Sequence, residues 1–526
     1  ILFLALLAVV TLGWTALTPS VMGDEWIYLV DHIRNGGPAC PELAIGARPL
    51  STCWMAFVYR LVGTSAGGFH AFGIVMNLIS ALLLLATLDI LLPDWASYNG
   101  AVVALYIVFP ADMTRTWLGG NVVIGSALLL LVAWPMARFW RDGRWWAWLA
   151  GMGAVAINLG FTEVMVGALI ALSGLAFLFG RHRTWLQRLG LLAPAIAAAG
   201  FSLWRWSWQQ SVGYAYGHDV GHVTTSPLLL LYRLYFGARY LLGESWTTTI
   251  LELQPFMPID GHVARVLGFV ILIGLVALAI LLARRISRNS HRFDPVAVRQ
   301  DVGIGETLDL LKAGLTGLVL LAAGFVPIIL AIGTGTGYTG SRAYQIPSIG
   351  ASLVICAVLF IVSLRLERTP ARARFIALAG LVPLLVVGIT GHIMVTRQLR
   401  EAWAEQKLIW NSLFEQAPDI VDGTHVLVLL DGYDIPGRGP RPMISGPWGI
   451  SSALQLLYGK DGLSASFVPA SPSRTLSIGD GDLLVFENAE YTNFPAAETL
   501  VFVFNRADQE LVQLKELENN GKVISL

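Results

Sequence analysis

The residues best suited to chemistry are two adjacent carboxylates, Asp24 and Glu25, which directly follow the first apolar stretch of the chain. Two acids at a membrane surface can provide a general base or ligate a metal ion. The alternative is structural, because Asp24 can cap a helix that runs to about Arg34. The two roles can coexist, so both remain open from these residues alone.

A third acid, Glu163, lies at the turn between two apolar stretches and has apolar residues on both sides. A carboxylate so close to hydrocarbon is costly unless it faces a cavity or a partner. We therefore predict a functional role for Glu163. Asp112 and Arg115 lie between two other apolar stretches, where they can pair with one another.

Three arginines near the predicted membrane surface are candidates for binding a phosphate group. Arg342 is the only charged residue in the connection 333–346. An isolated arginine at the mouth of a helix bundle suits a phosphate ligand. Arg48 and Arg233 are lesser candidates. The alternatives are arginines satisfied by helix-end carbonyls, or arginines of interfacial segments that reach lipid headgroups.

Cysteines and histidines give weaker signals. Cys40 and Cys53 fall in one connecting loop, and they can form a disulfide if that loop faces an oxidising compartment, or remain two thiols. His218 and His222 have the spacing of ligands on one helical face, but the surrounding glycines favour a loop. We therefore predict no metal site from the histidines.

The composition indicates that lipid is the solvent for most of the surface. The 526 residues are 55% hydrophobic and 13% charged, which is about half the charged fraction of a soluble domain. The net charge of zero gives no electrostatic case for binding nucleic acid. Scarce lysine and abundant arginine favour a bacterial source. The sequence begins at Ile1 within an apolar run, so we expect further residues to precede it.

The elements that must position these residues are membrane-spanning helices, each of which needs roughly 20 apolar residues. The stretch Leu50–Val62 is shorter, and we predict a helix that lies at the membrane interface. Eleven stretches are candidate spans: 1–21, 67–92, 97–113, 120–137, 146–162, 164–180, 187–206, 263–283, 313–333, 347–365 and 375–395.

Clusters of arginine orient the predicted bundle. They follow the fourth, sixth, eighth and tenth spans, which lie on one side of the membrane if the count is eleven. The positive-inside rule makes that side cytoplasmic. The opposite side then carries the connections 22–66, 207–262 and 333–346 and everything after about 396. These features predict a multi-pass protein of the bacterial inner membrane with a periplasmic C-terminal part.

The C-terminal part, residues 396–526, differs in composition from the predicted membrane domain 1–395. Short apolar runs bounded by turn residues are typical of buried strands. These runs predict a small accessory α/β domain. The predicted strands are His425–Leu430, Ser466–Val468, Leu483–Phe486 and Leu500–Phe504, and the predicted helices are Ala402–Phe414 and Ser451–Tyr458.

Taken in order, these positions resemble the GT-C superfamily of membrane glycosyltransferases, which use polyprenyl-phosphate-linked sugars. The likeness covers about residues 1–395 and is greatest to the tetratricopeptide-bearing transmembrane O-mannosyltransferases and their bacterial relatives. Asp24-Glu25 resembles the acidic motif whose Asp is implicated as the catalytic base. Arg48-Pro49-Leu50 resembles an Arg-Pro-Leu motif, and Pro110 with Trp117 looks like the Pro and Trp between spans three and four.

Two further motifs are similar but incomplete. Thr162-Glu163 resembles a Lys-Glu pair in which Lys is replaced. Ser341-Arg342-Ala343-Tyr344 with Pro347-Ser348-Ile349-Gly350 is similar to Glu-Arg-x-x-Tyr-x-Pro-Ser-x-Gly, with Ser341 in place of Glu. Asp112 is out of register with the acid expected there, and no tetratricopeptide repeats follow. These departures leave open a degenerate, inactive member.

The resemblance implies an inverting glycosyltransferase of hexosyl or pentosyl groups on the periplasmic face. Asp24 would be the base, Arg342 would bind the phosphate of a polyprenyl-phosphate sugar, and Glu163 would orient that arginine or a donor hydroxyl. The sequence identifies no cofactor, and a requirement for a divalent cation stays open. The alternative function is an inactive membrane scaffold that docks a protein partner through 396–526. A transporter is disfavoured because no internal repeat is evident.

Overall fold

The computed structural model describes most of the chain, and the described residues fall into two compact units. One unit comprises Ile1–Trp14, Pro41–Trp54 and Ala71–Met394, and the other comprises Thr15–Cys40, Met55–His70 and Val395–Leu526. The domain division predicted at 395–396 stays a prediction. The described residues are 1–17, 33, 49–111, 120–161, 165–179, 184–212, 226–252, 261–289, 304–331, 344–367, 369–431, 447–469, 476–478, 482–487, 490–519 and 522–525.

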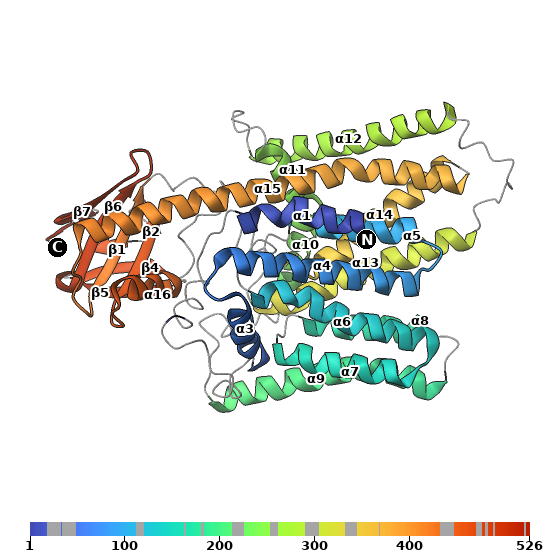
Figure 1. The fold of residues 1–526 in the computed structure, drawn as a ribbon, viewed down its shortest axis with the longest axis horizontal. Helices are drawn as coiled ribbons and strands as arrows, with labels where there is room; N and C mark the ends of the chain where they lie inside the picture. Colours follow the sequence, from blue (N-terminus) through green and yellow to red (C-terminus); the bar gives the residue numbers. More distant parts are fainter. Residues whose placement is uncertain are drawn as a thin grey trace. The chain divides into compact units, whose positions relative to one another are not determined.

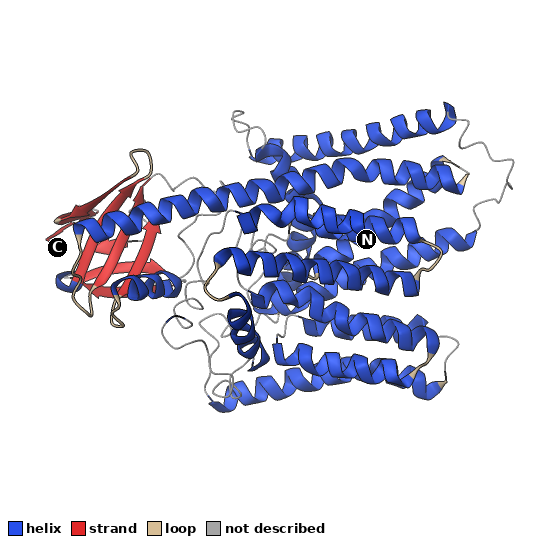
Figure 2. Cartoon of the chain, in the orientation of Figure 1, coloured by secondary structure: helices blue, strands red, loops and turns tan. Residues whose placement is uncertain are grey.

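Helices are the regular elements of the described residues before the C-terminal strands, and short turns join several of them (Figures 1 and 2). One turn, η5, is a π-helix, and the others are α-helices. The elements are α1 (Leu2–Leu17), α3 (Pro49–Val62), α4 (Ala66–Leu91), α5 (Ala96–Ile107), α6 (Gly120–Asp142), α7 (Trp145–Phe161), α8 (Val166–Phe179), α9 (Trp185–Val212), α10 (Pro227–Arg239), η5 (Tyr240–Glu244), α11 (Ser245–Glu252), α12 (Gly261–Asn289), α13 (Ile304–Ala331), α14 (Pro347–Leu366) and α15 (Pro370–Gln416).

Within the described residues, six helices contain a segment long and apolar enough to cross a membrane, namely α4, α9, α12, α13, α14 and α15. The chain is therefore a polytopic α-helical membrane protein, and this part of the predicted fold class is confirmed. Each of the eleven predicted spans falls on a helix, but the count of eleven crossings stays a prediction. The predicted helix at Leu50–Val62 is present as α3, and its place at the membrane interface also stays a prediction.

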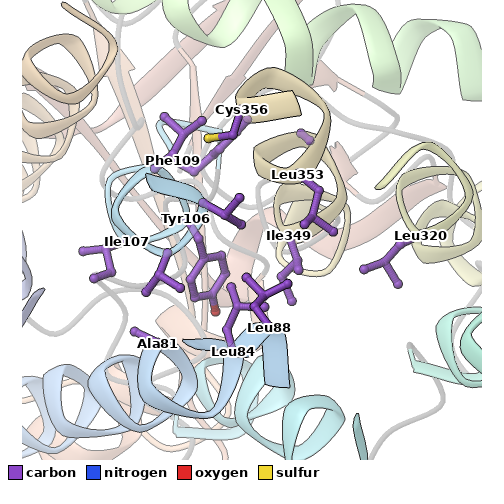
Figure 3. Close-up of a cluster of buried hydrophobic side chains, with 14 of the residues drawn as sticks. Ala81, Leu84, Leu88, Tyr106, Ile107, Phe109, Leu320, Ile349, Leu353 and Cys356 are labelled. Carbon is purple, nitrogen blue, oxygen red and sulfur yellow. The ribbon is translucent and has the colours of Figure 1, made fainter. Parts of the chain in front are cut away.

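Helix α5 lies in the core of the first unit, and nine of its twelve residues are buried. Figure 3 shows side chains of α4, the end of α5 and α14 gathered in one apolar cluster. The Tyr98 hydroxyl donates a hydrogen bond of 3.0 Å to the carbonyl oxygen of Leu353 in α14. A buried phenol needs such a partner, so this bond ties α5 to α14.

Glycine contacts hold α13 against α14. A Cβ atom on Gly350 would lie 2.5 Å from the carbonyl oxygen of Gly317 and 2.6 Å from the backbone nitrogen of Leu321. Lipid tails are as apolar as leucine, so helices in a membrane associate through close packing at small residues. Gly350 therefore allows the two backbones to touch at the start of α14, directly after Tyr344–Pro347.

The C-terminal part of the second unit is a small α/β domain, as predicted. Its four-stranded sheet has the order β2-β1-β6-β7, with β1 parallel to β2 and β6, and β6 antiparallel to β7. A central parallel strand is covered on both faces, which explains the uninterrupted apolar run of β1. The elements are β1 (His425–Asp431), α16 (Pro447–Tyr458), β2 (Ser464–Pro469), β3 (Leu476–Ile478), β4 (Asp482–Glu487), β5 (Glu490–Pro495), β6 (Thr499–Asn505), β7 (Glu510–Leu514), β8 (Glu516–Asn519) and β9 (Lys522–Ser525).

Two smaller antiparallel sheets complete the described part of this domain, β3-β4-β5 and β8-β9. The four predicted strands correspond to β1, β2, β4 and β6, and the two predicted helices lie within α15 and α16. Helix α16 packs on β2. The Ser451 hydroxyl accepts a 2.9 Å hydrogen bond from the backbone nitrogen of Ala465, which fixes the helix along the strand.

Candidate functional site

Only part of the predicted site lies within the described residues. Arg233, Tyr344 and Cys53 are described. Cys53 is disulfide-bonded, and Cys356 is a free, buried thiol. The other predicted site residues lie outside the described part of the chain: Asp24, Glu25, Cys40, Arg48, Asp112, Arg115, Glu163 and Arg342.

The residues that flank these positions in the sequence are described, and several of them meet in the first unit. Leu50, two residues after Arg48, packs against α7, where a Cβ atom on Gly160 would lie 2.5 Å from its Cδ1. The rings of Trp54 and Phe161 are also in contact, with centroids 6.0 Å apart. The chain after Arg48 therefore lies against the end of α7.

A second contact joins the start of α8 to the start of α14. A Cβ atom on Gly125 would lie 2.7 Å from Oε1 of Gln345 and 2.9 Å from Cε of Met165. The Asn158 amide donates to Sδ of Met165 at 3.0 Å, which ties the beginning of α8 back to α7. A side chain at position 125 would require the ends of these two side chains to shift, so α6 packs closely against both of them here.

Tyr344 is the best-defined of the predicted site residues. Its side chain is fully buried, and its ring lies 4.8 Å from that of Tyr240 and 5.6 Å from that of Phe325, measured between centroids. Burial raises the pKa of the Tyr344 phenol, so the hydroxyl stays neutral. Tyr344 therefore anchors the start of α14 against η5 and α13.

The π-helical turn η5 places an ion pair beside this anchor. Nη2 of Arg239 lies 2.6 Å from Oε1 of Glu244. Residues five apart fall on different faces of an α-helix, whereas the wider π turn brings them together. The Arg239 guanidinium also lies over the ring of Phe236, 5.4 Å from its centroid. Arg239 is thus held within its own helix, while Arg233 is half-buried on α10.

The segment that precedes Asp112 is held by α15. Nε2 of His392 lies 3.2 Å from the carbonyl oxygen of Phe109. A carbonyl only accepts, so Nε2 must carry the proton and donate it. Gly388 and Gly391 leave room for this approach, because a Cβ atom on Gly388 would meet the carbonyl oxygen of Val108.

Sequence reasoning missed two described residues, His392 and Arg205. Both are polar and buried within predicted spans. The available signal was a charged or titratable residue inside an apolar stretch, which in a membrane protein faces the bundle interior. Hydropathy alone does not tell which face of a helix points inward, so neither residue stood out.

No metal centre is formed by the described residues, since no three of their His, Cys, Asp or Glu side chains are arranged to hold an ion. The described contacts instead connect helix ends: the chain after Arg48 with α7, α8 with α14, and α14 with η5.

Comparison with known proteins gives a likeness in fold. No protein-family model matches the sequence, and no curated protein matches it. The chain is similar to ArnT from Cupriavidus metallidurans in the apo state, at 12% identity over 89% of this chain and 85% of that one, with a TM-score of 0.34. It is similar to the same protein bound to undecaprenyl phosphate at 11% identity over 94% and 97%, with a TM-score of 0.39. Likeness at these scores carries no argument about activity or site.

Proposed function

We propose that this chain is an inverting membrane glycosyltransferase of the GT-C type that moves a sugar from a polyprenyl-phosphate donor to an acceptor on the periplasmic face. The observation that carries the proposal is the meeting of described residues that flank the predicted motifs. Leu50 meets Gly160, and Met165 meets Gln345 across Gly125.

Chain geometry limits how far the predicted residues can be from these contacts. Two residues of extended chain span at most about 7 Å. Arg48 is two residues from Leu50, Glu163 is two residues from both Phe161 and Met165, and Arg342 is two residues from Tyr344. This limit on their distance from the described contacts supports a single site built from separate connections.

The proposed reaction uses one base and one leaving phosphate. Asp24 removes the proton of the acceptor hydroxyl as that oxygen attacks the anomeric carbon. The bond from the anomeric carbon to the phosphate oxygen breaks, and its electron pair leaves with the polyprenyl phosphate. Direct displacement by one nucleophile inverts the anomeric carbon, by the same stereochemical logic as in glycoside hydrolysis.

Arginine supplies electrostatic stabilisation in this proposal. Negative charge grows on the departing phosphate, so Arg342 stabilises the transition state more than the ground state. Arg48 and Arg233 contribute less, and Glu163 orients Arg342 or a donor hydroxyl. Glu25 lies beside the base, and a divalent cation at the pair is an open alternative. The predicted orientation puts this chemistry and the C-terminal domain on the periplasmic side of a bacterial inner membrane.

A binding experiment with undecaprenyl phosphate tests the donor site. This lipid is a polyprenyl phosphate, the class that the resemblance implies. Purified protein is equilibrated with it in detergent, and the retained lipid is measured by mass spectrometry. We expect Arg342→Ala to lower retention at least tenfold, because a charge-assisted contact to phosphate is lost. Arg397→Ala is the matched control, because Arg397 is an exposed residue paired with Glu401. Equal retention by wild type and Arg342→Ala would refute the donor site.

The catalytic half is tested separately with Asp24→Asn. Loss of sugar transfer with retained lipid binding is the expected result, because the amide cannot take the proton. Normal turnover would remove Asp24 from the mechanism. If both variants behave like wild type while removal of 396–526 abolishes function in cells, the scaffold alternative replaces the transferase.

A further inference from the structure

The starting observation is a pair of polar side chains on the protein-facing side of α12, close to its end. Most of this helix carries exposed apolar side chains, but its buried positions include Ile280, Ala283 and Ser287. Residues three, four and seven apart lie on one face of a helix. Arg284 follows Ile280 by four residues and is half-buried, so it belongs to the same face. A cation and a hydroxyl are therefore directed at the neighbouring helices.

Three helices meet within about two turns of this end. A Cβ atom on Gly380 of α15 would lie 2.9 Å from Cγ1 of Ile280 in α12 and 3.5 Å from Cδ2 of Leu359 in α14. Figure 1 shows α12 and α15 side by side, with the end of α12 and the beginning of α15 at the same end of the bundle. The end of α14 lies there as well, because only residues 367–369 separate α14 from α15.

The end of α14 adds a third buried polar group. Ser363 lies four residues beyond Leu359, on the face of α14 that meets Gly380, and its side chain is fully buried. Four residues of helix span about 6 Å, so Arg284 and Ser363 are each about one turn beyond the meeting point. Nε of Arg284, Oγ of Ser287 and Oγ of Ser363 are buried, and none of these atoms has a hydrogen-bond partner among the described residues.

These groups have the chemistry of an anion site. An unpaired donor inside a protein is costly, and a guanidinium stays charged at any pH at which a protein is folded. Segments 280–289 and 359–380 contain seven arginines and one acid, Glu367. Glu367 has an interaction of its own, and it does not accept a hydrogen bond from Nε of Arg284, which has no partner in the described part of the chain. The N-terminus of α15 at the same end also favours a negative charge.

The surface beside these groups indicates which anion they hold. Leu281, Leu282 and Ile286 lie next to Arg284 and Ser287 in α12, and all three are exposed apolar side chains of a membrane helix. The acyl chains of a lipid can cover such a surface while its headgroup reaches the polar groups. The arginine clusters predict that this end of the bundle is cytoplasmic, where basic pockets between membrane helices suit anionic headgroups.

We propose that the ends of α12 and α14 and the beginning of α15 form a binding site for the phosphate group of an anionic phospholipid. Arg284 supplies the charge, and the hydroxyls of Ser287 and Ser363 donate to the phosphate oxygens. The site does not depend on the proposed transferase activity. In the predicted orientation, it lies on the opposite side of the membrane from the proposed reaction.

Counting bound lipid by native mass spectrometry tests the site. Delipidated protein in detergent is titrated with phosphatidylglycerol. We expect Arg284→Gln to weaken binding roughly tenfold, because a charge-assisted contact to phosphate is lost, and Ser287→Ala and Ser363→Ala to weaken it less. Arg285→Gln is the matched control, since it removes the same charge from the next residue, which is exposed. Equal losses for Arg284→Gln and Arg285→Gln would reduce the effect to general surface charge and overturn the site.

Thermal midpoints separate the lipid from a free anion and from a fault in folding. Without lipid, Arg284→Gln should be at least as stable as wild type, because Nε of Arg284 has no partner among the described residues. Phosphatidylglycerol should raise the midpoint of wild type more than that of Arg284→Gln, and phosphatidylcholine, which has no net charge, should raise it less. Inorganic phosphate that stabilises wild type as strongly as phosphatidylglycerol would overturn the lipid assignment. An Arg284→Gln protein that is less stable without lipid would assign the arginine to the fold.

Discussion

At the scale of single residues, His425 shows how burial sets a charge state in the C-terminal domain. It begins β1 with 4% of its surface exposed, and Nδ1 lies 2.7 Å from the Ser464 hydroxyl. Its ring stacks on Phe494 at a centroid distance of 3.5 Å. Desolvation by burial lowers the pKa of His425 to about 4, so the imidazole is neutral in the folded domain near neutral pH.

This pKa predicts acid sensitivity. The unfolded chain takes up a proton on His425 near pH 6.5, whereas the folded domain takes it up only near pH 4. Stability from this residue is therefore fully present above pH 6.5, falls between pH 6.5 and 4, and is level below that. The total loss is about 3 kcal/mol at most. This loss of stability is measured as the urea midpoint of the C-terminal domain at several pH values. Limited proteolysis of the full chain reports the unfolding of the domain in each urea concentration. His425→Gln should flatten this dependence, and an equal loss in both proteins would assign the sensitivity to other groups.

Among the site residues, chemistry was easier to predict from the sequence than position. Glu163 and Arg342 stood out because a charge beside apolar residues is conspicuous. The residues that hold their neighbours in place, such as Gly125 and Gln345, did not stand out. A glycine in an apolar helix is common, and its value here lies in which side chains from other helices converge on it. That information is three-dimensional and has no local signature.

At the scale of elements, the close approach of α13 and α14 is a sensitive point. An alanine at Gly350 would press its Cβ against backbone atoms of Gly317 and Leu321, which cannot turn aside as a side chain can. We expect Gly350→Ala to cost about 1–3 kcal/mol and to displace the start of α14, where Tyr344 is anchored.

The matched control is Gly274→Ala in α12, where an added Cβ would meet nothing within 4 Å. Alanine favours a helix over glycine by about 1 kcal/mol, so this variant should be as stable as wild type or more so. Thermal midpoints in detergent compare the two. A Gly350→Ala protein as stable as Gly274→Ala would mean that the helices separate without cost.

The elements themselves were largely predictable, because apolar runs of membrane length and short apolar runs between turn residues are both strong patterns. Where the observed helices differ from the predicted ones, the differences have physical causes. The predicted span 375–395 is the interior of α15, which runs on to Gln416 because the polar residues that follow it are good helix formers. The π turn η5 was not predicted, since an extra residue in a helical turn changes neither composition nor hydropathy.

At the scale of the whole molecule, the arginine clusters predict one orientation in the membrane. A cysteine placed at Val421, which is 73% exposed, should react in intact cells with a maleimide that cannot cross the membrane. A cysteine placed at Arg144, whose side chain is 60% exposed, should react only after lysis. Background labelling is low because Cys356 is buried and Cys53 is disulfide-bonded. The reverse pattern would invert the topology and place the C-terminal domain in the cytoplasm.

The strand order β2-β1-β6-β7 also determines when β1 can pair with both of its neighbours during translation. Strand β1 is central, yet one of its two neighbours begins only at Thr499. At about 5–20 residues per second, translation of the intervening chain takes roughly 4–15 s. During that delay an apolar strand with unpaired backbone groups waits for its partner, and such edges readily pair with other chains. A newly made molecule therefore passes through an interval in which a holding chaperone, or the speed of the ribosome, decides between folding and aggregation.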